Sequence, residues 1–319
     1  MKAPLFIIGC PRSGTTLLLD LLAGTRAFGY VNNSAAGSVA TGTDHRRNRI
    51  YDVGSDRLVA WRPGIVAASS RIPVAGSVAD TFLPRPIEPW RFWEGLIPGF
   101  RPEQGDGPAE DPGAHHVDTA TVLNVRSAVA ALLHHQRRDV FLSKYTDFPR
   151  IELMRAVFPE ARFVHIHRDG HAVANSYATE IEGGRFGTWR DRFWWADAWP
   201  TEARSQWSAN RETILGFAAH NRNHLMNVIT EATKADPGVL TVSYEDLIAV
   251  PEMVLEQILA FATVRQRGPL DRLIHSRNLI NTNDRWRERR SGDETALLNA
   301  ILASQIDTSN PADFPEEVQ

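Results

Sequence analysis

The stretch LFIIGCPRSGTTLLLDLLAG, residues 5–24, decides the fold. Its apolar beginning, Leu5–Gly9, is typical of a short buried strand. The leucine-rich run at residues 15–24 ends in glycine and has the length of a helix. Between them, Gly9 and Gly14 have the spacing of a phosphate-binding loop, G-x-x-x-x-G, which joins a strand to a helix. The stretch therefore predicts a phosphate-binding strand–loop–helix unit.

The loop between the two glycines has its own cation and hydroxyl groups. Backbone N–H groups at the start of a helix hold anionic oxygens, and Thr15 or Thr16 supplies a hydroxyl donor beside them. A nucleoside triphosphatase needs lysine directly after the second glycine, but Thr15 stands there and the cation, Arg12, lies inside the loop. We therefore expect phosphate binding without ordinary ATP hydrolysis. The alternative is a tight turn that binds no ligand.

Strand and helix patterns alternate through much of the remaining chain. Strand patterns lie at residues 139–145, 161–167 and 238–244. Helix patterns lie after Asp118, which is the expected N-cap, and at 149–158 with Pro149 in the first helical position, 169–180 and 251–262. Repeated units of this kind build a parallel sheet with helices on both faces. The sequence therefore predicts an α/β fold, a three-layer sandwich with a central, mainly parallel sheet and a P-loop-like nucleotide-binding core.

Composition excludes several classes of protein. The 319 residues include 35 basic and 38 acidic side chains, a net charge of −3, so the chain lacks the basic excess that sequence-independent nucleic-acid binding requires. The apolar start ends at Pro11, too early for a signal peptide or a membrane span. Cys10 is the single cysteine, and no cysteine–histidine cluster has zinc-site spacing. We expect a cytoplasmic protein with no transmembrane segment; the sequence predicts no oligomeric state.

Two stretches interrupt the alternating pattern. Residues 32–117 contain nine of the 19 prolines and the aromatic cluster 90–93, so we predict an ordered insertion packed over the sheet edge. Insertions of this kind often carry substrate contacts. Residues 186–207 hold five of the nine tryptophans, which either line a substrate cleft or pack in the core. Since there is neither an internal repeat nor a linker, we predict one domain over residues 1–319.

A second motif, FVHIHRDGHAVANS at residues 163–176, joins a strand pattern to a helix pattern. Arg168 ends the strand, at the edge where open α/β sheets bind ligands, and Ser176 lies on the helix. Arginine offers a planar fork for phosphate oxygens and serine a neutral donor, so the pair predicts a second phosphate site. An arginine that caps the sheet edge is the alternative. His165 and His167 share one strand face and are predicted to be packed, hydrogen-bonded side chains.

Together, the motifs resemble those of the sulfotransferase family that uses 3′-phosphoadenosine 5′-phosphosulfate (PAPS), in its bacterial, Golgi and tyrosylprotein branch. CPRSGTTLL resembles the family's 5′-phosphosulfate loop, and RDGHAVANS resembles its 3′-phosphate motif. FLSKYTDFPRI and VSYEDLIAVP resemble two further elements, which keep the family's order. The matching segments cover residues 5–24 and 140–290.

The resemblance implies a donor site and a reaction. It implies that PAPS is the cofactor, that 3′-phosphoadenosine 5′-phosphate (PAP) is its product, and that the acceptor is a hydroxyl of a small molecule, sugar or lipid. No metal is required. By analogy, the phosphosulfate is held by Arg12, Ser13, Gly14, Thr15 and Thr16, the 3′-phosphate by Arg168 and Ser176, and the adenosine lies near Tyr244. Asn281, Asn283 and Trp286 stand where a further donor element is expected.

Sulfuryl transfer needs fixed cations, because negative charge grows on the oxygen that bridges sulfur and phosphate. Arg12 and Lys144 are the predicted catalytic cations; Lys144 is one of three lysines and ends a predicted strand. Two other functions fit the first loop. A nucleotide-dependent kinase is disfavoured by Thr15 in the lysine position, and a non-catalytic nucleotide-binding protein by the presence of both cations. None of the motifs specifies the acceptor.

The general base is the residue for which the resemblance gives no direct match. The family often has glutamate or histidine after its second strand, but Asn32 and Asn33 stand there and cannot accept a proton at neutral pH. We therefore predict that the base comes from the insertion, at Glu88, which lies between two prolines. A solvated loop glutamate is the alternative, and His115 and His116 are the next candidates.

Overall fold

The computed structural model describes residues 2–32, 86–100, 117–146, 148–183, 213–265, 270–277 and 279–303. Most of the predicted insertion and the tryptophan-rich stretch 186–207 lie outside these residues, as do Asn33, His115 and His116. What the sequence predicts for those positions stays a prediction.

The described residues contain a five-stranded sheet in which every pairing is parallel. The central strand is β1 (Leu5–Ile8), with β3 (Val140–Tyr145) and then β2 (Phe28–Tyr30) on one side, and β4 (Arg162–His167) and then β5 (Val239–Ser243) on the other. This confirms the predicted strands and the parallel sheet. Because the strands run in one direction, the loops that follow β1, β3 and β4 meet at the carboxyl edge of the sheet.

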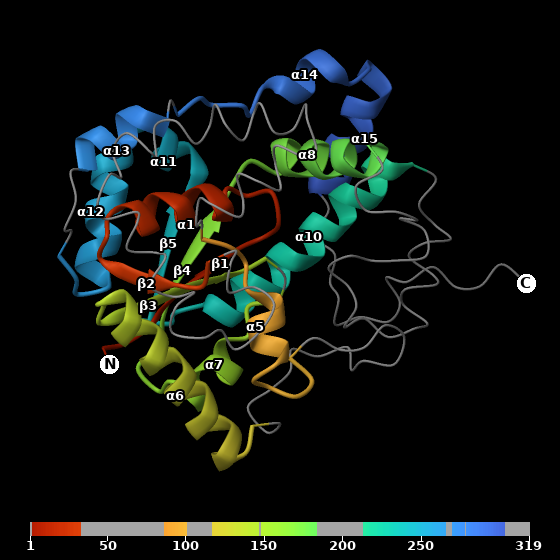
Figure 1. Cartoon of the computed structure of the whole chain (residues 1–319). Coiled ribbons are helices and arrows are strands. Elements are labelled where there is room, and N and C mark those ends of the chain that lie inside the picture. Colours follow the sequence, from red (N-terminus) through yellow and green to blue (C-terminus); the bar gives the residue numbers. More distant parts are fainter. Residues whose placement is uncertain are drawn as a thin grey trace, which may run out of the picture.

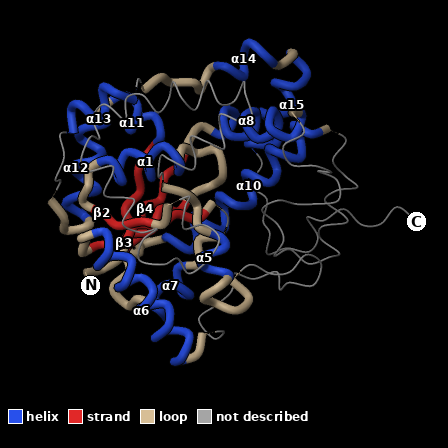
Figure 2. Tube along the Cα trace, viewed as in Figure 1, coloured by secondary structure: helices blue, strands red, loops and turns tan. Residues whose placement is uncertain are grey.

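Helices cover both faces of the sheet and make the predicted three-layer sandwich (Figures 1 and 2). One face packs against α1 (Thr15–Gly24), α11 (Tyr244–Ala249), α12 (Pro251–Phe261) and α13 (Leu270–Arg277). The other packs against α5 (Trp90–Glu94), α6 (Thr119–Gln136), α7 (Ile151–Val157) and one end of α10 (Ile214–Thr233). A further cluster around Cys10 joins α10 to α8 (Gly170–Glu182), α14 (Arg285–Arg289) and α15 (Gly292–Ala303).

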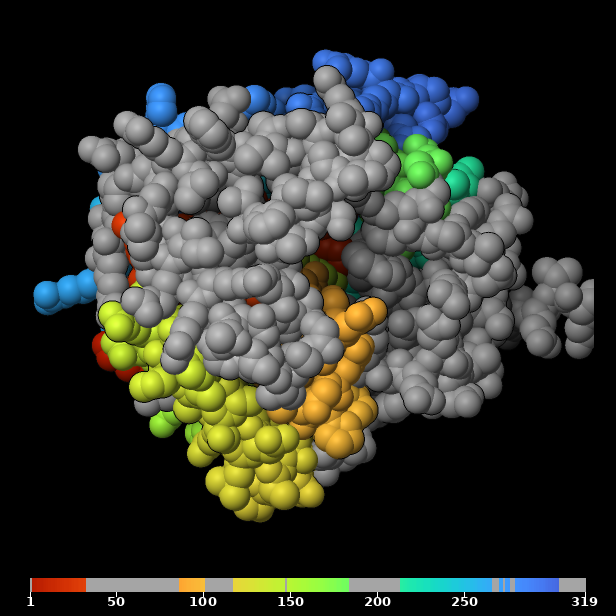
Figure 3. All heavy atoms as spheres, in the orientation of Figure 1, coloured from red at the N-terminus to blue at the C-terminus, as the bar shows by residue number. Residues whose placement is uncertain are grey.

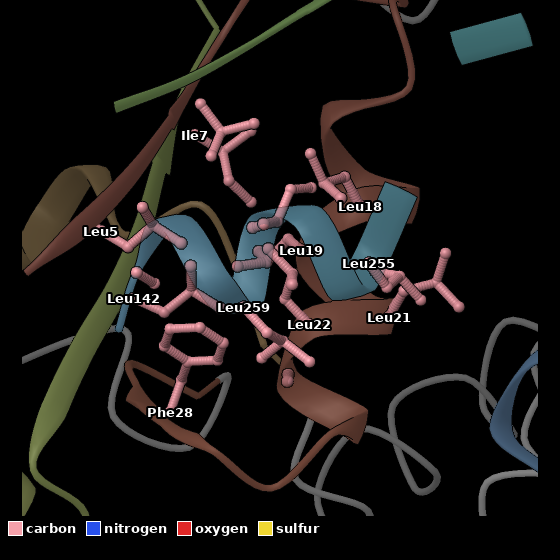
Figure 4. Packing of buried hydrophobic residues seen from close by; sticks show 14 of the residues in the cluster. Leu5, Ile7, Leu18, Leu19, Leu21, Leu22, Phe28, Leu142, Leu255 and Leu259 are labelled. Carbon is pink, nitrogen blue, oxygen red and sulfur yellow. The ribbon is translucent and has the colours of Figure 1, made fainter. Parts of the chain in front are cut away.

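The sequence of β1 explains why both of its faces are covered. Successive side chains of a strand point to opposite faces, so an uninterrupted apolar strand needs a hydrophobic layer on each side. Leu5 and Ile7 pack with the α1 leucines and with Leu255 and Leu259 of α12, as Figure 4 shows. The alternate side chains of β1 belong to the cluster on the opposite face.

Side chains at the helix ends fix several of the predicted boundaries. Asp118 accepts the backbone N–H of Thr121 at 2.7 Å, which confirms it as the N-cap of α6. Asp169 accepts the N–H of Ala172 at 2.8 Å and caps α8 in the same way. Pro251 starts α12, where its missing N–H costs no helical hydrogen bond.

The prediction that Pro149 is the first residue of a helix is wrong. The helix α7 begins two residues later, at Ile151, and its N-cap Arg150 has a left-handed φ of 49°. The guanidinium of Arg150 is buried and donates to the carbonyls of Phe148 at 3.0 Å and Phe100 at 3.4 Å. These tertiary contacts keep the backbone in a turn that the local sequence does not reveal.

The described part of the insertion, residues 86–100, packs on one face of the sheet and reaches its carboxyl edge at Glu88. Trp93 is completely buried, and its ring lies 6.3 Å from Phe6 and 6.0 Å from Phe141, centroid to centroid. Phe6 belongs to the central strand, so this segment is part of the main core. A segment anchored in this way holds the residues just before it close to the sheet.

His165 on β4 is buried, as predicted, with 3% of its surface exposed. The predicted hydrogen bonds are wrong, because neither ring nitrogen has a partner within the described part of the chain. The ring of His167 lies 6.1 Å away. Burial lowers the pKa of His165 to about 4, and the charge of His167 acts in the same direction. His165 is therefore neutral in the folded protein at neutral pH.

Acid should destabilise the fold through His165. An ordinary histidine has a pKa of 6.5, whereas His165 in the folded protein has a pKa of about 4. Between these two pH values, the unfolded chain therefore binds a proton at His165 that the folded chain does not bind. The free energy of unfolding should therefore fall as the pH drops through this window, by up to about 3 kcal/mol. Urea unfolding between about pH 7 and pH 4.5 measures the loss. His165→Leu should lose less stability over the same range; equal slopes for the two proteins would contradict the prediction.

Candidate active site at the carboxyl edge of the sheet

The loop after β1 is packed so closely that both of its glycines are required. A Cβ atom on Gly9 would lie 2.5 Å from the carbonyl oxygen of Ile166, and one on Gly14 would lie 2.6 Å from Cδ2 of Tyr244. Gly14 also has a φ of 99°, which side chains disfavour. Arg12 has a φ of 73° without being glycine, so its surroundings must hold it there. Some atoms of the N-terminal segment, coloured red, are visible near the middle of Figure 3.

The N-terminus of α1 leaves backbone hydrogen-bond donors available beside this loop. Among the described residues no side chain caps α1, whereas α8 has its aspartate. The first backbone bond of α1 runs from the N–H of Leu18 to the carbonyl of Gly14, so the N–H groups of residues 15–17 come before it. Ser13 is completely buried, and its hydroxyl has no partner in the part of the chain that the structure describes. An anion with several oxygens fits this set of donors.

A chain of polar contacts connects the loop to the segment before α5. Lys144 on β3 is 5% exposed, and its Nζ donates to Oγ1 of Thr16 at 3.0 Å and lies 3.1 Å from Oε2 of Glu88. The other carboxylate oxygen of Glu88 accepts the hydroxyl of Thr146 at 2.5 Å. With the Glu88 side chain 17% exposed, the ion pair is largely shielded from water. The structure thus brings the predicted cation Lys144 and the predicted base Glu88 into direct contact.

The side chain of Arg12 reaches α8. Its Nε donates to Oγ of Ser176 at 2.9 Å, and its Nη2 lies 2.9 Å from Oε1 of Glu180. Ser176 and Glu180 are four residues apart and therefore lie on one face of the helix. Arg12 consequently links the first phosphate motif to the second.

Each nitrogen of the Arg168 guanidinium donates one hydrogen bond, which uses three of its five N–H groups. Nη1 donates to the backbone carbonyl of Arg12 at 3.1 Å, Nη2 to Oγ1 of Thr282 at 2.9 Å, and Nε to Oδ1 of Asn283 at 2.8 Å. Its Cζ lies 4.2 Å from the centroid of the Tyr244 ring. Burial lowers the pKa of Arg168 from its usual value. The bond to the Arg12 carbonyl is one contact that supports the left-handed backbone there.

Of the three residues named for a further donor element, Asn283 contacts Arg168. Asn281 accepts the backbone N–H of Asn283 at 2.9 Å, and Trp286 is buried with its ring stacked 4.7 Å from that of His171. Trp286 therefore has a packing role in the structure.

Sequence reasoning did not identify two carboxylates at this edge, Glu180 and Glu245. Glu245 accepts the side-chain N–H of Asn283 and the backbone N–H of Asp169, the latter at 3.1 Å. Each had a signal in the sequence: Glu180 lies one helical turn after Ser176, and Glu245 belongs to the segment VSYEDLIAVP.

A protein-family model described as the sulfotransferase family matches residues 4–267. The chain belongs to the sulfotransferase family. The matched residues include the loop after β1, Lys144 on β3 and Arg168 directly after β4. No curated protein sequence matches the chain.

Several solved structures of sulfotransferases are similar to the chain at low identity. STF9 from Mycobacterium avium is 17% identical with a TM-score of 0.49, and the alignment covers 96% of this chain and 76% of that one. STF1 from Mycobacterium tuberculosis H37Rv is 13% identical with a TM-score of 0.48, covering 95% and 77%. The sulfotransferase domain from the Synechococcus PCC 7002 olefin synthase is 17% identical with a TM-score of 0.42, covering 95% and 97%.

Membership of this family defines the class of enzyme. The protein is a PAPS-dependent sulfotransferase, which replaces the kinase and the non-catalytic alternatives. Its cofactor is PAPS, and the donors at the start of α1 fit the oxygens of a phosphosulfate. Within the described ranges, no group of three histidine, cysteine, aspartate or glutamate residues is arranged to hold a metal ion. None of the described helices is long and apolar enough to cross a membrane.

Proposed function

We propose that this sulfotransferase transfers the sulfuryl group of PAPS to a hydroxyl group of a small-molecule, sugar or lipid acceptor. The contact chain from Thr16 through Lys144 to Glu88 carries the proposal, because it connects the donor loop to a carboxylate outside it. Transfer to a hydroxyl requires a cation that stabilises the leaving oxygen and a carboxylate that accepts the proton of the hydroxyl.

The proposal extends to the organisation and the location of the protein. We propose one domain over residues 1–319, with an acceptor-side insertion at about 32–117 that contributes Glu88. We also propose a cytoplasmic location, which the single, free Cys10 supports because it forms no disulfide.

For the donor, we propose three contact groups. The uncapped start of α1 and the buried Ser13 hydroxyl support a phosphosulfate site, and the fixed guanidinium beside an aromatic ring supports a 3′-phosphate site next to the adenosine. The residues are Arg12, Ser13, Gly14, Thr15 and Thr16 for the phosphosulfate, Arg168 and Ser176 for the 3′-phosphate, and Tyr244 for the adenosine.

The residues of this chain then divide the work of the transfer step. When bound, PAPS supplies an activated sulfuryl group and a phosphate leaving group. Lys144 and Arg12 stabilise the negative charge that develops on the leaving oxygen as its bond to sulfur breaks. Glu88 accepts the proton of the acceptor hydroxyl as the new oxygen–sulfur bond forms. Both cations are already held by hydrogen bonds, so they need little reorganisation during the reaction.

Binding of PAP tests the two phosphate sites separately. PAP should raise the Tm of the protein, whereas AMP, which lacks the 3′-phosphate, should raise it much less. Arg168→Ala should weaken PAP binding by about 2 kcal/mol or more, about 30-fold in Kd, because a charge-assisted fork is lost. Titration calorimetry measures the affinity. Arg162→Ala, at the opposite end of β4, is the matched control and should bind PAP normally. Equal stabilisation by AMP and PAP would refute the role of Arg168.

The acceptor class is tested by labelling. The protein is incubated with radiolabelled PAPS and a whole extract of its own host, which contains both proteins and small molecules, and the labelled product is identified. A labelled sulfate ester of a small molecule, sugar or lipid supports the proposal. Label found only on protein would contradict it.

A further inference from the structure

The carboxylate of Glu180 touches the site but has no part in the reaction described above. Its Oε1 lies 2.9 Å from Nη2 of Arg12, the cation of the donor loop. The side chain of Glu180 is 20% exposed and that of Arg12 is 35% exposed, so water screens the pair only in part. A negative charge at this place opposes the binding of an anionic donor. A favourable effect of Glu180 on another step at the site must therefore offset this repulsion.

The helix that carries Glu180 is held firmly. Asp169 caps the start of α8, and Arg290 fastens its far part, donating to Oδ1 of Asn175 at 2.8 Å and to Oε1 of Glu182 at 2.9 Å. The side chain of Arg290 is buried, with 8% exposed. Glu180 is thus presented to Arg12 by a rigid element, which is the condition for precise positioning.

Arg12 has a long side chain that would otherwise sample many rotamers. Its backbone carbonyl is held by Arg168, and its guanidinium is held at Nε by Ser176 and at Nη2 by Glu180. Two contacts at different nitrogens of a planar group restrict the orientation of its plane more than one contact does. Glu180 is thus one of the contacts that restrict the rotation of the Arg12 guanidinium.

We propose that Glu180 is a positioning residue that orients the Arg12 guanidinium for sulfuryl transfer while its charge weakens donor binding. The inference rests on the proposed role of Arg12 in the transfer step. It predicts opposite effects on two measured quantities: loss of the Glu180 charge should tighten the binding of PAP and slow the transfer. A residue that only stabilised the fold would not produce this split.

The test uses Glu180→Gln, which keeps the length of the side chain and removes its charge. The affinity for PAP should rise about threefold to tenfold, because a repulsive charge is removed, and kcat should fall about tenfold, because the cation is less well oriented. Glu256→Gln, at an exposed position of α12, is the matched control and should change neither quantity. In an Arg12→Ala background, Glu180→Gln should lower kcat no further.

Three outcomes would overturn the proposal. One is an unchanged kcat and PAP affinity in Glu180→Gln. Another is a full additional loss of kcat in the Arg12→Ala background, which would show that Glu180 acts without Arg12. The third is loss of a limb of the pH–rate profile in Glu180→Gln, which would make Glu180 a proton acceptor instead.

A measurement on the protein without donor separates this inference from the proposed function. The Nε–H signal of Arg12 in an NMR spectrum is identified by its absence in Arg12→Lys. Hydrogen exchange at this Nε–H should be faster in Glu180→Gln than in the wild type, since the guanidinium is held less firmly. Equal exchange rates would overturn the positioning role even in an active enzyme. Suppose instead that exchange is faster in Glu180→Gln, but the wild-type protein neither binds PAP nor transfers a sulfuryl group. That result would support the positioning contact and refute the proposed function.

Discussion

Lys144→Met should lower kcat by about a hundredfold or more, because one preorganised cation is removed from the leaving oxygen. Methionine fills the space of the lysine stem but has no charge, so the change isolates the electrostatic contribution. The affinity for PAP should fall less than in Arg12→Ala, since Arg12 belongs to the donor loop and Lys144 reaches that loop from β3. Steady-state rates with saturating PAPS measure kcat, and calorimetry measures the PAP affinity.

The chain offers a matched control for this experiment. Lys234→Met removes a lysine whose side chain is 71% exposed and paired with Glu231, so its rate should equal that of the wild type. Lys144→Arg keeps the charge and should recover part of the activity. Glu88 loses its ionic partner in Lys144→Met, which costs stability. Thermal denaturation therefore has to show that the variant is folded. A folded Lys144→Met protein with a near-normal rate would show that Lys144 is peripheral to the reaction.

Local patterns predicted the elements that are specified by residues close together in the sequence. The helix predicted at residues 15–24 is α1, Thr15–Gly24, and the strand predicted from Leu5 is β1, Leu5–Ile8. Both follow from spacing within a single stretch, where an apolar run, two glycines and a leucine repeat leave few alternatives. The same is true of Asp118, whose capping side chain acts on a residue three positions away.

Contacts between distant residues account for what the sequence did not predict. Arg12 bonds to Ser176 across 164 positions, so the local spacing that places Glu180 on the same helix face as Ser176 does not indicate that both contact Arg12. The wrong start of α7 has the same origin, because the buried Arg150 is held by Phe100, 50 positions away. Strand alternation predicted that His165 would be buried, but a hydrogen-bond partner depends on the layer packed against it.

The sequence named candidate site residues where a motif placed them, and it named only some of their contacts elsewhere. The donor loop is specified by residue types at fixed spacing, so its residues could be named from the sequence. Thr282 and Asn283, which hold Arg168, lie more than a hundred positions after it in a segment without a clear pattern. Asn283 was one of three residues named from its approximate place in the chain, and the structure separates it from Trp286, which packs against His171.

Glu88→Gln should lower kcat by about two orders of magnitude while PAP binding survives, because the change keeps the shape of the side chain and removes its basicity. The structure supports testing Glu88 first: it lies 3.1 Å from Lys144, beside the loop proposed to hold the phosphosulfate, and is mostly shielded from water. In the pH dependence of kcat, the acidic limb should be lost in the variant, since that limb reports protonation of the base.

Two controls distinguish a base from a residue that only holds Lys144. Glu94→Gln changes an exposed carboxylate at the end of α5 in the same segment and should leave the rate unchanged. Thr146→Val removes the hydroxyl that Glu88 accepts at 2.5 Å and should lower kcat while the acidic limb is kept, because the carboxylate is still present but less well oriented. If Glu88→Gln is slow but keeps the acidic limb, Glu88 acts by holding Lys144, and the acceptor proton must go to another group. If it is as fast as the wild type with the same limb, Glu88 has neither role.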